Sequence, residues 1–177
     1  MNVEIIAHRG FWLKTEEKNT LVAFHRALEN GFGIETDIRD FNGDLVVSHD
    51  IPNTSCQPLP DLFDLYNKAH GKYPLALNIK ADGLSLLLKK QLSIFNIANY
   101  FVFDMSVPET LAYIRLGLAV FTRQSEYELT PSLYQKSEGL WLDEFNSSWI
   151  NLEIIKEHFM NLSKQDRETI LRFLESL

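Results

Sequence analysis

Two histidines and two carboxylates near the start of the chain have the types and spacing needed to cleave a phosphodiester bond. Such cleavage needs a proton acceptor, a proton donor and stabilisation of the negative charge that develops on the phosphate oxygens. Histidine titrates near neutral pH, so His8 and His49 are the candidate acid and base. Glu35 and Asp37 stand two residues apart and could together bind a divalent cation, which would stabilise that charge.

A β-strand must carry the two carboxylates, because residues i and i+2 share a face only in an extended chain. The alternation from residue 32 onward predicts this strand, with Glu35 and Asp37 on one face. Residues 3–7 form an apolar run that stops at His8, which predicts a short buried strand opening into a loop. The first histidine and the acid pair are therefore expected at strand ends.

A hairpin is expected to return the second histidine to the acid pair. Asn42-Gly43 is a strong two-residue turn signal between two apolar segments. An ideal turn would place Thr36 opposite His49, whereas a single bulge would place Glu35 there. The sequence leaves both registers open, and in either of them His49 comes back beside the acid pair.

Helix signals frame the connections between strands. One helix is expected between a cap at Asn19 or Thr20 and a closing Gly31, and another between Ser106 and Gly117. The remaining elements are two more helices and four more strands: helices at 60–69 and 84–95, and strands at 75–80, 100–103, 118–121 and 140–145, with two further helix patterns after residue 151.

Strands alternating with helices predict an α/β fold with a central parallel sheet. Polar side chains gather where strands end, and in barrel folds the active site lies at that end of the strands: His8, Arg9, Glu35, Asp37, Lys80, Asp104, Arg123 and Asp143. Arg9 and Lys80 are the candidate phosphate ligands. Arg123 and Trp141 complete the candidate substrate-binding set, although core packing is the commoner role for such a tryptophan.

Five motifs follow one another between residues 7 and 50: Ala7-His8-Arg9-Gly10, Asn19-Thr20 with Ala23-Phe24, Glu35-Thr36-Asp37-Ile38, Asn42-Gly43-Asp44 and Val47-Ser48-His49-Asp50. Together they resemble the N-terminal signature of the glycerophosphodiester phosphodiesterases. Asn78-Ile79-Lys80 falls where that family has a Glu-x-Lys motif, so the resemblance covers about half of the chain.

The resemblance implies a (β/α)8-type barrel that hydrolyses glycerophosphodiesters to glycerol 3-phosphate and an alcohol, using Mg²⁺ or Ca²⁺. Carried over position by position, it also implies three sets of roles: acid–base catalysis by His8 and His49, metal binding by Glu35, Asp37 and Asn78, and phosphate contact by Arg9 and Lys80.

The chain departs from the family pattern in several places. The third acidic metal ligand is here Asn78, an amide that keeps an oxygen but loses a charge, so metal affinity should fall. Lys18 stands where the family has glutamate, and few residues separate Asp50 from Asn78. No convincing strand follows Phe145, so the barrel is expected to be incomplete, open, or closed by a partner such as a second copy of the chain.

Bulk composition limits the classes of function. The 177 residues carry a formal charge of −7, which argues against nucleic-acid binding, and they are expected to form a single domain. No apolar run is long enough for membrane insertion and no signal peptide is visible, which predicts a cytoplasmic protein. The leading hypothesis is a metal-dependent hydrolase of a small phosphodiester. The alternatives are a weakened relative that binds a sugar phosphate or phosphorylated headgroup without turnover, and an unrelated α/β domain.

Overall fold

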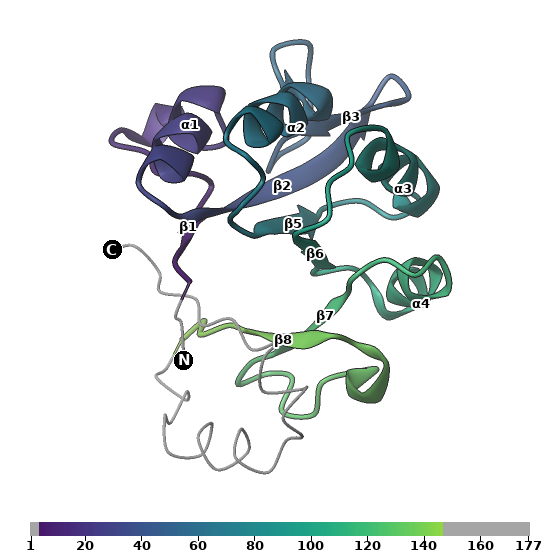
Figure 1. The fold of residues 1–177 in the computed structure, drawn as a ribbon. Helices are drawn as coiled ribbons and strands as arrows, with labels where there is room; N and C mark the ends of the chain where they lie inside the picture. The colour runs from purple at the N-terminus through teal and green to yellow at the C-terminus, as the bar shows by residue number, and fades with distance from the viewer. Residues whose placement is uncertain (1–3, 147–177) are drawn as a thin grey trace.

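The computed structural model describes residues 4–146, which form a row of strands backed by helices (Figure 1). In chain order the elements are β1 (Ile6–His8), η1 (Thr15–Glu17), α1 (Leu21–Glu29), β2 (Gly33–Phe41), β3 (Asp44–Val47), β4 (Gln57–Pro58), α2 (Leu59–Lys68), β5 (Leu75–Ile79), α3 (Ser85–Ile94), β6 (Tyr100–Phe103), α4 (Val107–Arg115), β7 (Phe121–Gln124), η2 (Tyr134–Lys136) and β8 (Gly139–Leu142).

Six of the strands run parallel in the order β1-β2-β5-β6-β7-β8. Hydrogen-bonded ladders join β1 to β2, β2 to β5, β5 to β6 and β7 to β8, and a single bridge between Val102 and Val120 links β6 to β7. The antiparallel strands β3 and β4 extend the edge of β2 beyond the point where β1 ends. The mixed α/β fold with mostly parallel β–α units agrees with the prediction from the sequence.

The closed barrel is not present in residues 4–146. Within this part of the chain β1 pairs only with β2, and β8 pairs only with β7, so the row of parallel strands remains open at both ends. A (β/α)8 barrel closes only when eight tilted strands complete the circle, and six span too little of it. The helix patterns expected after residue 151 lie outside the described residues.

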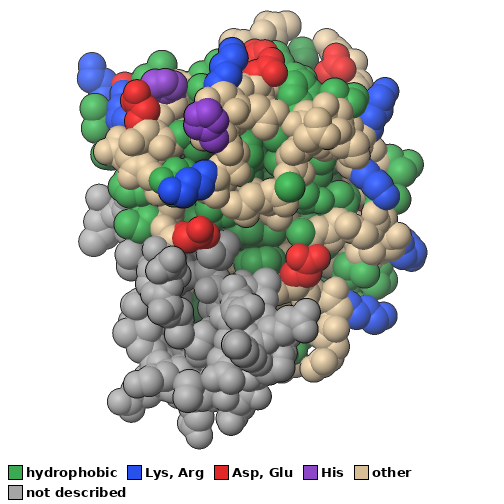
Figure 2. Space-filling model, in the orientation of Figure 1, with side chains coloured by type: hydrophobic (Ala, Val, Ile, Leu, Met, Phe, Trp, Pro, Cys, Tyr) green, Lys and Arg blue, Asp and Glu red, His purple; other side chains and the backbone are tan. Residues whose placement is uncertain are grey.

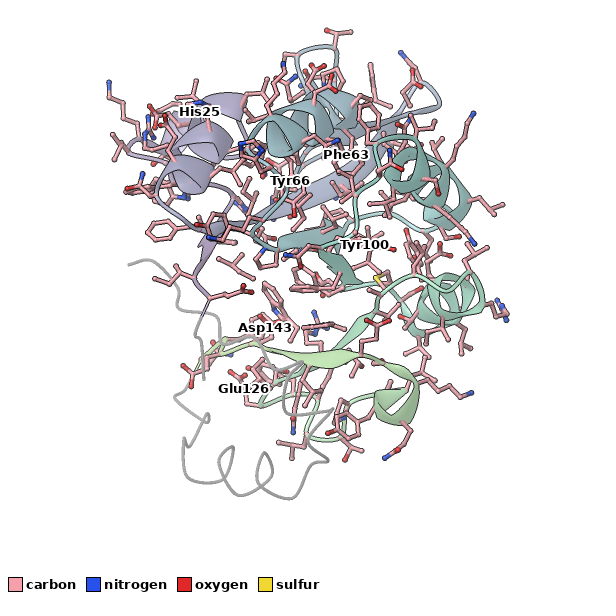
Figure 3. The ribbon with its side chains drawn as sticks, viewed as in Figure 1. His25, Phe63, Tyr66, Tyr100, Glu126 and Asp143 are labelled. Carbon is pink, nitrogen blue, oxygen red and sulfur yellow. The ribbon has the colours of Figure 1, made fainter. Side chains whose placement is uncertain are left out.

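Alternation along the strands divides the core into two clusters. Side chains on one face of the sheet, such as Ile34 and Leu77, pack against the helices, and α2 contributes the fully buried Phe63 and Tyr66 (Figure 3). Side chains on the other face form a mainly aromatic cluster: Ile6, Ala76, Phe101, Phe103, Phe121 and Trp141. The acid pair on β2 therefore lies on the same face as the aromatic cluster.

The predicted helix ends are confirmed. The Thr20 side chain accepts a hydrogen bond from the N–H of Ala23 and caps α1. Gly117, with φ +70°, follows α4, and the N–H of Leu118 still bonds to the carbonyl of Tyr113 at 3.2 Å. This closing motif holds Leu118 against the helix. As a result β7 begins at Phe121, later than residue 118, where the sequence predicted it.

No helix in residues 4–146 combines the length and the apolar character needed to cross a bilayer. On the face drawn in Figure 2, acidic and basic side chains are interspersed instead of forming a patch of one sign.

Candidate functional site

Glu35, Asp37 and Asn78 lie together on the inner face of the sheet, and we call them the carboxylate site. Strand pairing places Asp37 beside Asn78, and it places His8 beside Glu35. Both carboxylates are only 1% exposed, and Asn78 is 8% exposed. The sequence-predicted metal ligands are thus brought together by two neighbouring parallel strands.

Asp37 is surrounded by polar groups from three other segments. Its Oδ2 accepts a hydrogen bond from Asn19 Nδ2 at 2.8 Å and lies 3.2 Å from Arg9 Nε, while its Oδ1 lies 3.5 Å from Lys80 Nζ. Asn19 in turn accepts a 2.9 Å hydrogen bond from the Thr36 hydroxyl. The sequence identified Asn19 as a motif residue and an alternative helix cap, but gave no sign that it contacts Asp37.

The buried carboxylate of Glu35 has weaker polar contacts than that of Asp37. Its Oε2 accepts a hydrogen bond from the backbone N–H of Arg9 at 3.1 Å, and its Oε1 accepts one from Asn78 Nδ2 at 3.4 Å. The His8 imidazole stands 3.8 Å from the same carboxylate. Burial raises the pKa of Glu35 to about 8, and the neighbouring Asp37 carboxylate adds to the increase. Glu35 is therefore mostly protonated at neutral pH unless a cation joins it.

The hairpin adopts the register without a bulge. Ile38 pairs with Val47, and the N–H of Ser48 continues the ladder to the Asp37 carbonyl at 3.0 Å. This register brings His49 level with Thr36, one of the two positions that the sequence left open. His49 lies just past the end of β3, and its Nδ1 is 2.9 Å from the Asp50 carboxylate. Its imidazole is about half exposed and faces Asp50, so the structure does not bring it into contact with the acid pair.

A divalent cation fits the oxygen atoms of the carboxylate site, although the charge is low. Asp37 Oδ1 and Asn78 Oδ1 are buried and have no hydrogen-bond donor within the described part of the chain. These two oxygens lie on neighbouring strands beside the carboxylate of Glu35, and they are of the type that Mg²⁺ and Ca²⁺ prefer, although Asp37 Oδ1 also faces the Lys80 ammonium at 3.5 Å. Residues 4–146 contain no cluster of three or more His, Cys, Asp or Glu side chains able to hold a metal.

A chain of ion pairs leads away from the carboxylate site. Lys80 Nζ, besides facing Asp37, lies 3.2 Å from Asp104 Oδ2, and Asp104 Oδ1 lies 2.5 Å from Arg123 Nη1. Arg123 Nε also contacts Glu128, at 2.5 Å. A third carboxylate, that of Asp143, lies 4.0 Å from Arg123 Nε. Arg123, expected as a substrate ligand, is therefore engaged with three carboxylates in this structure.

Trp141, also expected to bind substrate, lies within the aromatic cluster. It is 8% exposed and stacks on Phe103 with ring centroids 3.7 Å apart. Its indole N–H donates a 2.6 Å hydrogen bond to Asp143, which follows β8 (Figure 3). In this structure the indole packs the inner face of the sheet.

The comparisons with known proteins concern the fold. The chain is similar to the crystal structure of a glycerophosphodiester phosphodiesterase from Agrobacterium tumefaciens strain C58, with a TM-score of 0.59 and 14% sequence identity. The match covers 97% of this chain and 86% of that one. The two proteins share a fold. The resemblance inferred from the motifs is confirmed at that level, while no family model and no curated protein matches the sequence.

The ion-pair chain makes a prediction about stability. Asp104→Asn should lower the free energy of unfolding by about 1–2 kcal/mol, because Lys80 and Arg123 then face an uncharged group. Asp104 has φ +70°, which asparagine tolerates, so the backbone is preserved. Urea denaturation measures the change. Asp82→Asn is the matched control, since Asp82 accepts hydrogen bonds only from the exposed Ser106 hydroxyl; an equal loss in both variants would contradict the prediction.

Proposed function

We propose that this chain hydrolyses a small phosphodiester, such as a glycerophosphodiester, with the help of Mg²⁺ or Ca²⁺. The observation that carries the proposal is the buried pair of Glu35 and Asp37, where Asp37 Oδ1 and the neighbouring Asn78 Oδ1 accept no hydrogen bond within the described residues and a histidine lies next to the pair. The fold shared with a glycerophosphodiester phosphodiesterase supports the same reaction class. A buried acid pair with this surplus of acceptors is costly unless a cation completes it.

In the proposed reaction the side chains of this chain have two kinds of role, cation binding and proton transfer. Glu35, Asp37 and Asn78 would hold the divalent cation, which neutralises charge on the phosphate oxygens and lowers the pKa of a bound hydroxyl group or water. One of the two imidazoles, His8 or His49, accepts the proton of the attacking hydroxyl group. The other donates a proton to the alcohol oxygen as its bond to phosphorus breaks.

The cations beside the carboxylate site would orient the phosphate. Arg9 and Lys80 already face Asp37, at 3.2 and 3.5 Å, so they stand next to the place where the cation would bind. The guanidinium can bind two phosphate oxygens at once, whereas the lysine acts as a point charge. Asp104 holds Lys80 from the other side and keeps its ammonium at the strand ends.

A direct assay tests this function. The purified chain is incubated with bis-p-nitrophenyl phosphate, glycerophosphocholine or glycerophosphoinositol, each with Mg²⁺, Ca²⁺ or Mn²⁺ and each with a chelator. We expect hydrolysis that requires one of the metals. Absence of hydrolysis with all three diesters and all three metals would refute the proposal.

Metal affinity should rise with pH, because the cation must displace the proton from Glu35. The pKa of Glu35 is raised to about 8 by its burial and by Asp37. Below that pH the apparent affinity should increase by up to about tenfold per pH unit, and above it the affinity should level off. Calorimetry at pH 6, 7, 8 and 9 in buffers of different ionisation enthalpy measures both the affinity and the released proton. A flat profile would show that Glu35 is not a ligand.

The same raised pKa predicts how the metal-free protein responds to pH. The folded state holds the proton on Glu35 with a pKa of about 8, whereas the unfolded chain releases it near the ordinary glutamate pKa of 4.5. The contribution of Glu35 to stability is therefore fully present below pH 4.5 and is lost as the pH rises toward 8.

A second function, binding without turnover, is favoured by one specific feature. Only two charged ligands are present, and Arg9 and Lys80 already offset the charge of Asp37. A site with this balance could retain a sugar phosphate or a phosphorylated headgroup without the cation. Calorimetry separates the functions: metal binding that Glu35→Gln abolishes supports the hydrolase, and phosphate binding without any metal binding supports the binder.

A further inference from the structure

Lys18 is a cation beside the carboxylate site that has no carboxylate partner among the described residues. It directly precedes Asn19, whose side chain reaches Asp37 at 2.8 Å. Arg9 and Lys80, by contrast, both face carboxylates. The ammonium of Lys18 therefore remains available to a ligand.

Trp12 holds Lys18 in place. The ammonium of Lys18 lies 4.3 Å from the centroid of the Trp12 ring, a cation–π contact. The indole N–H of Trp12 donates a 3.1 Å hydrogen bond to the backbone carbonyl of His8, a candidate catalytic residue. Two consecutive contacts thus connect the Lys18 ammonium to the backbone of His8, the last residue of β1.

The residues next to Lys18 in the loop have other partners, so the neighbouring carboxylate does not balance the charge of Lys18. The carboxylate of Glu17, next to Lys18 in the chain, accepts hydrogen bonds from Arg26 and from the Leu13 N–H, both at 2.8 Å. The N–H of Asn19 bonds to the Arg9 carbonyl at 3.0 Å. The nearest acid in sequence is therefore committed to α1, and the loop is fixed at both ends of the Lys18 segment.

We propose that this site selects phosphodiesters whose alcohol group carries an additional negative charge, with Lys18 as the specificity-determining residue. The inference rests on the proposed hydrolase function. An anionic group on the leaving alcohol is attracted by the Lys18 ammonium, which has no carboxylate partner among the described residues. A quaternary ammonium such as choline meets repulsion, and it finds one face of the Trp12 ring already covered by a cation.

The test compares three glycerophosphodiesters that differ in headgroup charge. Glycerophosphoinositol and its 4-phosphate form a matched pair that differs by one phosphate group, and glycerophosphocholine carries a cation. We expect kcat/KM to be roughly fivefold higher for the 4-phosphate than for glycerophosphoinositol, and lowest for glycerophosphocholine. Lys18→Glu should abolish or reverse this order, mainly through KM.

Lys14→Glu is the matched control. Lys14 lies in the same loop and gives the same change in net charge, but it is exposed and precedes η1 without contacting Trp12. It should leave the substrate order unchanged. Equal kcat/KM values for the three diesters, or equal effects of the two substitutions, would overturn the specificity inference while the hydrolase function stands. No hydrolysis of any diester would overturn both.

Discussion

Replacing either His8 or His49 with alanine should lower kcat/KM for phosphodiester hydrolysis by about 10²–10⁴-fold, the usual contribution of a positioned acid or base. His8 lies 3.8 Å from the Glu35 carboxylate, and the half-exposed His49 follows β3, which pairs with β2. Each substitution should also remove one limb of the pH–rate profile. Steady-state kinetics from pH 5 to 9 measures both effects.

His25→Ala is the matched control for this experiment. His25 projects from α1 and pairs with Glu29 at 3.2 Å, on the exposed side of the helix (Figure 3). Its removal should leave kcat/KM unchanged, and circular dichroism should show all three variants folded. Activity that persists in both His8→Ala and His49→Ala would eliminate the proposed mechanism.

His49 shows why contacts in the absence of substrate do not decide catalytic roles. Its imidazole faces Asp50 and not the acid pair, and its backbone carbonyl accepts a hydrogen bond from Arg39 at 3.1 Å. Catalytic hydrogen bonds often form only once substrate is bound. The hairpin places His49 level with Thr36, and the imidazole is about half exposed.

Local patterns were sufficient to predict the parts of the site that depend on neighbours in the sequence. The alternation of strand side chains placed Glu35 and Asp37 on one face. The Asn42-Gly43 turn, where both residues have positive φ, allowed only two registers for His49. Each of these features is decided within a few residues, so composition and spacing determine it.

The contacts around Asp37 and Lys80 could not be predicted in the same way. Asn19 reaches Asp37 from the loop before α1, and Asp104 reaches Lys80 from the end of the next strand. These contacts depend on how elements distant in sequence pack, and each residue taken alone resembles an ordinary loop or strand-end residue. Likewise, the sequence predicted that Trp141 lies on a strand, but it could not predict whether the indole would contact solvent or the ring of Phe103.

The sequence indicated an incomplete or open barrel because no convincing strand follows Phe145, but strand–helix alternation by itself does not decide closure. Strand–helix alternation predicts parallel neighbours, which the ladders of β1, β2, β5 and β6 confirm. Closure depends on the number and tilt of strands summed around the circle. The alternation of strands and helices along the chain does not specify the number of strands in the sheet or their tilt. Residues 4–146 supply six parallel strands, where the family resemblance implied eight.

Asn78→Asp should raise the affinity for Mg²⁺ or Ca²⁺ by about tenfold or more, because it adds a charged ligand without changing side-chain size. Without metal the same substitution should destabilise the protein. It removes the amide hydrogen bond to Glu35 and adds a third carboxyl group beside Glu35 and Asp37. Metal binding to the folded state should then restore stability, so the rise in Tm on adding metal should be larger than in the unaltered protein.

Three further variants make this result decisive for the carboxylate site. Asn78→Glu, the residue type that the family resemblance implies, should act in the same direction, and Glu35→Gln should abolish metal binding. Asn67→Asp makes the same amide-to-acid change on the exposed face of α2, where the amide bonds to the Phe95 carbonyl. It should alter neither metal affinity nor the metal-dependent rise in Tm. Calorimetry and thermal unfolding measure these quantities, and an Asn78→Asp variant with unchanged affinity would mean that Asn78 does not occupy the third ligand position.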